Sequence, residues 1–220
     1  MRTLSKPAGL PVMRPHADSQ GDCLLARLLR DEPERASLAW PDGFEGGIAH
    51  RLDTGTSGAV AVARDPDDLA ALRTLFAEHR LLKRYLLLVA RDPGWDEHGT
   101  DAPIAHDPRR KGRVVVQRGR STPHRGRWLP AETTFRRLDG ALFEARMRTG
   151  VMHQIRAHAA FLGIPILGDR RYGGGPPPPG APAGEGFHLH HVGFEGPDGL
   201  HTAPVPTPAW AQPRSTHTGA

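Results

Sequence analysis

Apolar residues recur along the chain at two spacings, one typical of helices and one typical of strands. The helical spacing predicts core-facing helices at Ser19–Asp31, from Asp65 to about Arg80, and at His153–Leu162. Asp65 and Pro66 are typical of a helix start, because Asp caps the first turn and Pro fits the first helical position. Gly163 is placed to end the last of these helices.

Strand patterns occupy five further stretches, which are Ala59–Arg64, Lys83–Arg91, Glu132–Leu138, Ala141–Arg148 and Phe187–Phe194. The third and fourth flank Asp139-Gly140, a strong signal for a two-residue hairpin turn. Residues 92–130 lack a sustained pattern, so we expect them to be irregular apart from a possible strand at Val114–Gln117.

Proline and glycine mark the segments outside these elements. Lys6–Val12 (KPAGLPV) predicts a turn that leaves a short strand, and residues 32–47 predict a loop. Residues 173–186 (GGGPPPPGAPAGEG) are of low complexity and predict a loop insertion. We therefore expect one domain over residues 1–206, followed by a disordered tail at 207–220.

The chain of 220 residues has a net charge of +5, and nearly all of its positive charge is arginine. Arginine suits bidentate contacts to phosphate, although GC-rich coding DNA also produces arginine-rich chains. Eight cations lie between residues 109 and 127, where Asp107 is the nearby acid, and this clustering favours phosphate contact over a solvated loop.

Composition also limits the other chemistries that this chain can carry. The single cysteine, Cys23, excludes an intrachain disulfide and a cysteine-based zinc site, and its apolar surroundings predict a small buried residue. His153 and His158 are five residues apart, unlike the four-residue spacing of zinc-binding helices, and we expect no metal. No P-loop or GxGxxG motif indicates a nucleotide cofactor, and no apolar run predicts a membrane span or a signal peptide, so we expect a cytoplasmic protein.

Residues 50–58 (HRLDTGTSG) place Asp53 in a turn rich in Gly, Thr and Ser. Such a turn either is capped by the aspartate or aims the carboxylate at a ligand. Two later blocks also stand out, which are KRY at 83–85 and TGVMHQIRAHAAFLGIPILGDRRYGG at 149–174. From the pattern alone, Tyr85 packs its ring in the core, and Arg156 points away from the apolar face of its helix.

In this order, KPAGLPV, HRLDTGTSG, KRY, the long 149–174 block and the closing TAPVP at 202–206 resemble RNA pseudouridine synthases of the RluA type. The resemblance implies an α+β fold, in which flanking helices pack beside a mixed, largely antiparallel central sheet. It also implies an isomerase that converts uridine in ribosomal or transfer RNA to pseudouridine without a cofactor, and we expect a monomer.

The resemblance assigns roles to particular residues. Asp53 is the catalytic carboxylate, Arg156 pairs with it, and Tyr85 stacks on the target uracil and moves a proton. The residues expected to contact RNA are His50, Arg51, Thr56, Arg109, Arg110, Lys111, Arg113, His153 and Gln154. The chain departs from the family at Val151, where Arg is most often found, and in a first strand that is shortened or missing, with no room for an S4-type RNA-binding domain.

Two alternatives remain open. The first is an RNA-binding or chaperone protein with the same fold and no activity. Val151, the short N-terminus and the proline-rich insertion favour it, and the intact Asp53, Tyr85 and Arg156 disfavour it. The second is a glycosidase acting on free nucleosides, which would normally need two paired carboxylates where this chain has one in a motif.

Overall fold

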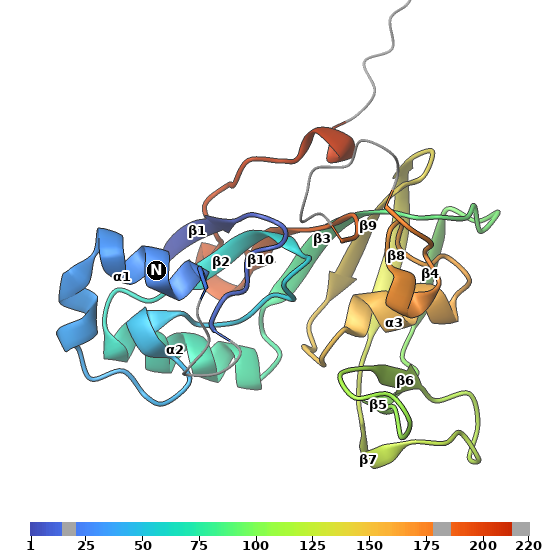
Figure 1. Ribbon diagram of the computed structural model, residues 1–220, viewed down its shortest axis with the longest axis horizontal. Coiled ribbons are helices and arrows are strands. Elements are labelled where there is room, and N and C mark those ends of the chain that lie inside the picture. Colours follow the sequence, from blue (N-terminus) through green and yellow to red (C-terminus); the bar gives the residue numbers. More distant parts are fainter. Residues whose placement is uncertain (15–20, 178–185, 213–220) are drawn as a thin grey trace, which may run out of the picture.

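A seven-stranded mixed sheet forms the centre of the protein (Figure 1). The computed structural model describes residues 1–14, 21–177 and 186–212. The strand order is β1-β2-β10-β3-β9-β8-β4, and every pair is antiparallel except β10 with β2. The strands are β1 (Arg2–Lys6), β2 (Ser57–Val62), β3 (Leu82–Leu88), β4 (Glu97–Thr100), β8 (Thr133–Asp139), β9 (Leu142–Met147) and β10 (Leu189–Glu195). The predicted α+β class with a largely antiparallel central sheet is confirmed.

The predicted helices are present in shortened form. They are α1 (Leu24–Asp31), α2 (Pro66–Ala77) and α3 (Gln154–Phe161). Asp65 caps α2 as expected, because its side chain accepts a hydrogen bond from the Asp68 amide at 2.8 Å. Cys23 is buried and caps α1, and its sulfur accepts from the Ala26 amide at 3.3 Å. The expected start of α1 at Ser19 lies outside the described residues.

Residues 92–130 are more regular than the sequence indicated. Besides β4, they contain β5 (Ile104–His106), β6 (Val114–Val116) and β7 (Arg125–Leu129), which form a separate three-stranded antiparallel sheet in the order β6-β5-β7. The sequence pattern predicts β6 alone among these strands. Each of the others is three to five residues long, so the alternation of apolar and polar residues is too brief to read.

The first strand is present in the shortened form that the sequence suggested: β1 has five residues and pairs along its whole length with β2. The expectation of a disordered tail from residue 207 needs correction. Part of the predicted tail is ordered, because Ala209–Ala211 forms a 3₁₀ turn in which the Trp210 ring lies 5.1 Å from the His188 ring. Residues 213–220 and the central part of the proline-rich loop, 178–185, lie outside the described residues.

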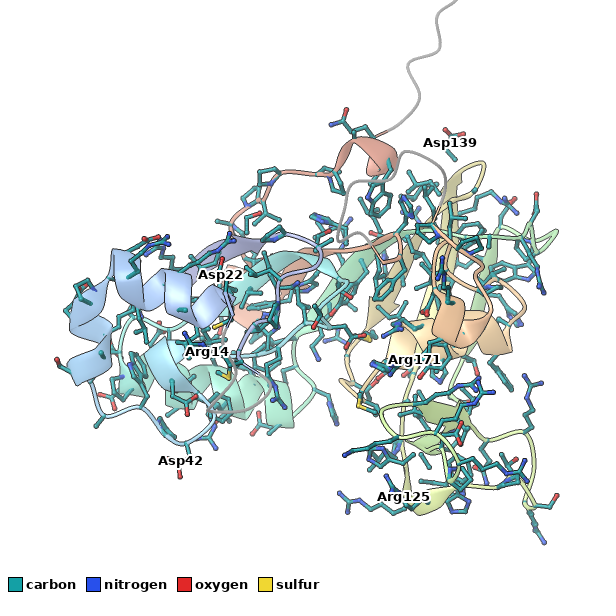
Figure 2. All side chains as sticks on the ribbon, viewed as in Figure 1. Arg14, Asp22, Asp42, Arg125, Asp139 and Arg171 are labelled. Atoms are coloured by element: carbon teal, nitrogen blue, oxygen red, sulfur yellow. The ribbon has the colours of Figure 1, made fainter. Side chains whose placement is uncertain are left out.

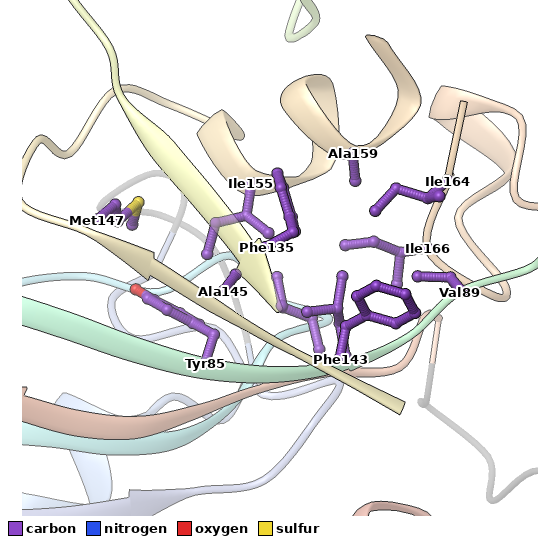
Figure 3. Close-up of a cluster of buried hydrophobic side chains, with 12 residues drawn as sticks. Tyr85, Val89, Phe135, Phe143, Ala145, Met147, Ile155, Ala159, Ile164 and Ile166 are labelled. Carbon is purple, nitrogen blue, oxygen red and sulfur yellow. The ribbon is translucent and has the colours of Figure 1, made fainter. Parts of the chain in front are cut away.

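The helices cover the sheet in two groups, with α1 and α2 beside β1, β2 and β10 and with α3 beside β9 and β8 (Figure 1). A cluster of buried side chains joins α3 to the sheet through Phe135, Phe143 and Ile155 (Figure 3). A second cluster joins α3 to the small sheet through Ile104, Ala157 and other residues. The small sheet therefore lies against α3, the helix that carries Arg156. Within the described ranges, none of the helices combines the length and the apolar character needed to cross a bilayer.

Candidate active site

The turn that carries Asp53 is fixed by hydrogen bonds from both sides. The Thr56 amide donates to the Asp53 carbonyl at 3.0 Å, and the Gly9 amide donates to the Thr54 carbonyl at 2.9 Å. Lys6 is almost fully buried and donates from Nζ to the Thr54 and Leu10 carbonyls at 3.0 and 2.6 Å. Burial lowers the pKa of Lys6 to about 8, although the negative charge of Asp53 acts in the opposite direction. The KPAGLPV segment thus supports the turn.

Arg156 lies between two carboxylates. Its Nη1 donates to Asp53 Oδ2 at 2.9 Å, while its Nε and Nη2 donate to the two oxygens of Asp169 at 2.7 and 3.0 Å. Burial acts to lower the pKa of Arg156, but Asp169 and then Asp53 outweigh it and raise that pKa above its usual value. The side chain of Asp53 is 27% exposed and that of Asp169 only 1%, so one carboxylate faces the solvent side and the other anchors the arginine.

Two aromatic rings hold the guanidinium of Arg156 from its faces. Its central carbon lies 4.2 Å from the centroid of the Phe187 ring and 5.2 Å from that of Tyr172. Gly55 leaves room for Phe187, because a Cβ atom there would lie 2.7 Å from the phenylalanine ring. With both carboxylates in place, these rings leave Arg156 little freedom to move away from Asp53.

Tyr85 lies in the middle of β3 and belongs to a row of paired residues that runs across β3, β10 and β2. His191 of β10 pairs with both Tyr85 and Gly58, and the tyrosine and histidine ring centroids are 4.5 Å apart. Gly58 allows β10 to approach, because its φ is 120° and a Cβ would lie 2.1 Å from the His191 carbonyl oxygen. Figure 3 shows the Tyr85 hydroxyl pointing away from the Phe143 end of the core. Burial, and then the nearby charge of Asp53, raises the pKa of Tyr85, so its hydroxyl keeps its proton.

His153 approaches the same carboxylate from the start of α3. Its Nε2 lies 3.7 Å from Asp53 Oδ2, and its Nδ1 lies 3.0 Å from the Tyr172 hydroxyl. Its backbone adopts the left-handed conformation, with φ of 55°, which is unusual for a residue other than glycine. Burial lowers the pKa of His153, against the opposing effect of Asp53, and this shift favours the neutral ring.

Three of the residues expected to contact RNA are instead engaged inside the protein. His50 accepts a hydrogen bond from the Ala61 amide at 3.1 Å, and burial lowers its pKa well below the usual value. Thr56 is buried, and Gln154 is buried with its amide bonded to Thr133, Thr149 and the Val151 amide. These placements favour a structural role over direct RNA contact. Arg51 is exposed and remains available.

A basic loop over residues 107–113, which we call the arginine loop, joins β5 to β6. Asp107 shapes it by accepting hydrogen bonds from the Arg109 and Arg110 amides at 2.8 and 3.1 Å, and these bonds lower the pKa of Asp107. Arg109, Arg110 and Lys111 are exposed, whereas Arg113 is half-buried over the Tyr172 ring. The small sheet carries further outward side chains, Arg125 among them (Figure 2).

Sequence reasoning assigned no role to Lys6, Asp169 or Tyr172, although each lies in a block that carries the resemblance. It did identify Val151 as a departure, and that side chain packs beside Tyr172 and Ala157 at the junction of α3 with the small sheet. Across the described residues, no three His, Cys, Asp or Glu side chains form a group that could hold a metal ion.

Comparison with known proteins places this chain in a family. Residues 2–161 match the family model for RNA pseudouridylate synthase. An uncharacterized RNA pseudouridine synthase of Chloroflexus aurantiacus is 39% identical over 77% of this chain, and the ribosomal large subunit pseudouridine synthase D of Zymomonas mobilis is 32% identical over 77%. These alignments cover 51% and 52% of the two relatives.

The fold agrees with the sequence match. The solved structure of human RNA pseudouridylate synthase domain containing 4 superposes with a TM-score of 0.67 over 95% of this chain and 86% of the human chain, at 24% identity. The mixed central sheet with its flanking helices therefore has a pseudouridine synthase fold. The chain belongs to the RNA pseudouridylate synthase family, and within it to the RluA type. It spans about half the length of the bacterial relatives that it matches, and 29% of a chloroplastic relative from rice.

Proposed function

We propose that this protein isomerises specific uridines in RNA to pseudouridine, with Asp53 as the catalytic carboxylate. The observation that carries the proposal is that Arg156 binds two carboxylates of different exposure. A buried carboxylate, Asp169, anchors the arginine through its Nε and Nη2, and a partly exposed carboxylate, Asp53, accepts a hydrogen bond from its Nη1. Such an arrangement keeps a charged oxygen oriented toward a substrate.

The reaction breaks the glycosidic bond, turns the uracil over and joins C5 to C1′. Asp53 either attacks C1′ or assists elimination across the sugar, and both routes need one carboxylate and a site closed to water. Burial and the charge of Asp53 keep the Tyr85 hydroxyl protonated, and we assign its ring, which is 6% exposed, to stacking on the uracil. Since the base must leave its stack to reach Asp53, uridines in loops cost least to modify.

Charge supports RNA as the substrate. Arg109, Arg110 and Lys111 are exposed on the arginine loop. This loop belongs to the small sheet, which packs against α3 through a common cluster of buried residues. Phosphate contacts there would hold the RNA while one nucleotide enters the site. The name of the Zymomonas relative makes large-subunit ribosomal RNA the first substrate to test, with transfer RNA the second. A monomer acting in the cytoplasm without a cofactor completes the proposal.

The test is nucleoside analysis of cellular RNA. RNA from a strain lacking this gene should miss one or more pseudouridines, and expression of the wild-type protein should restore them while Asp53→Asn should not. Restoration by Asp53→Asn would contradict the catalytic role. Unchanged pseudouridine in the deletion strain, with RNA still bound by the purified protein, would favour the inactive RNA-binding alternative.

A further inference from the structure

Asp53 receives its protein partners on one oxygen. Both Arg156 Nη1, at 2.9 Å, and His153 Nε2, at 3.7 Å, approach Oδ2. Among the residues that the structure describes, no side chain forms a hydrogen bond or ion pair with Oδ1. The two oxygens of this carboxylate are therefore not equivalent, and Oδ1 is the one left free for a substrate.

The state of the His153 ring decides what it presents to Oδ2. A neutral imidazole has one N–H donor and one lone-pair acceptor, and the group that bonds one nitrogen sets the character of the other. At Nδ1, the neighbour is the Tyr172 hydroxyl, at 3.0 Å. If Nδ1 carried the proton, the lone pair of Nε2 would face the carboxylate of Asp53, which is repulsive.

The environment of Tyr172 favours the Nε2–H tautomer. Its hydroxyl oxygen accepts the Val114 amide hydrogen of β6 at 3.0 Å, so its own proton remains to be donated. Among the described residues, His153 Nδ1 is the group besides the Val114 amide that lies within hydrogen-bond distance of this hydroxyl, so it is the acceptor for that proton. With Tyr172 donating to Nδ1, the proton of His153 lies on Nε2 and points at Asp53, and every polar atom in the chain of contacts has a favourable neighbour.

From this geometry we infer that Tyr172 is a positioning residue, which fixes the Nε2–H tautomer of His153 so that this N–H faces Oδ2 of Asp53, beside the hydrogen bond that Arg156 donates to the same oxygen, and Oδ1 is left to react. The inference rests on the proposed function for its catalytic consequence, but the tautomer itself is a property of the resting protein. The left-handed backbone of His153 fits this role, because such strain persists where surrounding contacts hold a side chain in place.

The first experiment measures the tautomer without any substrate. In protein with ¹⁵N-labelled histidine, long-range ¹⁵N–¹H correlation spectra distinguish a protonated Nε2 from a protonated Nδ1, and His153→Gln assigns the signal. We expect the Nε2–H form in the wild type and a mixture of tautomers in Tyr172→Phe, which keeps the ring that packs on Arg156. A wild-type Nδ1–H form, or an unchanged tautomer in Tyr172→Phe, would overturn the inference.

The second experiment separates catalysis from RNA binding. Tyr172→Phe should lower kcat about fivefold to tenfold, the effect of one neutral hydrogen bond, with KM for RNA unchanged. In a His153→Gln background the same substitution should have no further effect on kcat. A raised KM with unchanged kcat, or independent effects of the two substitutions, would refute the positioning role. A wild-type protein inactive on every RNA would refute the proposed function, whereas the spectra would still decide the tautomer.

Discussion

Replacing Asp169 by Asn tests the view that the two carboxylates on Arg156 have different tasks. The amide keeps the shape of the side chain but removes the negative charge that compensates a buried guanidinium. The carboxylate of Asp169 accepts a hydrogen bond on each of its two oxygens, whereas the asparagine side chain has only one acceptor oxygen. One N–H of Arg156 is therefore left without its partner. Breaking a buried ion pair by removing one member costs about 3–5 kcal/mol.

Asp53→Asn is the matched control, because it makes the same chemical change against the same arginine. Asp53 is 27% exposed, and Asp169 still compensates Arg156 in that variant, so its free energy of unfolding should change by less than about 1 kcal/mol. For a chain of this size, about 3 kcal/mol corresponds to a fall in Tm of roughly 6–12 °C for Asp169→Asn.

Urea and thermal unfolding of both variants measure the difference in stability, and a uridine-isomerisation assay measures its catalytic consequence. A displaced Arg156 no longer aligns Asp53, so Asp169→Asn should also lower kcat about a hundredfold at unchanged RNA affinity. Equal stability of the two variants, or full activity of Asp169→Asn, would refute the assignment of Asp169 as the anchor.

Three further predictions concern binding, alignment and pH. Arg156→Lys should lower kcat about a hundredfold with RNA affinity retained, because an ammonium cannot bridge two carboxylates with a planar fork; kinetics close to wild type would contradict this. Replacing the four cations of the arginine loop by Gln should weaken RNA binding. It should also reduce the slope of log K against log salt by about 0.7–0.9 for each phosphate that is no longer neutralised. As a control, Gln at Arg27 and Arg30 on α1 should leave this slope unchanged. Burial lowers the pKa of His190 and of His191 to about 4, below the value of about 6.5 in an unfolded chain, so the unfolded state binds more protons and stability falls as the pH drops from 6.5 to 4. Urea titrations should show that these two histidines together contribute a decrease of roughly 4 kcal/mol between pH 7 and pH 5, and His190→Gln should remove about half of it; a flat profile would contradict the burial argument.

Local signals in the sequence predict much of the sheet and the helices. The Asp139-Gly140 turn sets the β8–β9 hairpin, and Asp65 with Pro66 starts α2, because each signal acts over a few residues. Apart from β6, the small sheet escapes prediction, because it packs against α3 through residues such as Ile104 and Ala157, which are distant in sequence. The short strands β5 and β7 carry too little pattern to be recognised alone.

The active site divides in the same way. The resemblance pairs Asp53 with Arg156, and the structure brings them within 2.9 Å across 103 residues of sequence. Asp169 and Tyr172 lie in the same sequence block as Arg156, but nothing local indicates that one carboxylate is buried against the arginine or that the tyrosine bonds His153. Conversely, Gln154 is expected from the resemblance to contact RNA, yet its own bonds to Thr133 and Thr149 enclose it.

The most direct test of the central claim is tritium release from RNA labelled at C5 of uridine, with purified wild-type protein and Asp53→Asn compared on RNA from a strain lacking this gene. Release of C5 tritium accompanies isomerisation, because C5 forms the new glycosidic bond. We predict release by the wild type and none by Asp53→Asn, with equal RNA affinity and similar stability in the two proteins. Equal release by both would contradict the assignment of Asp53 as the catalytic carboxylate.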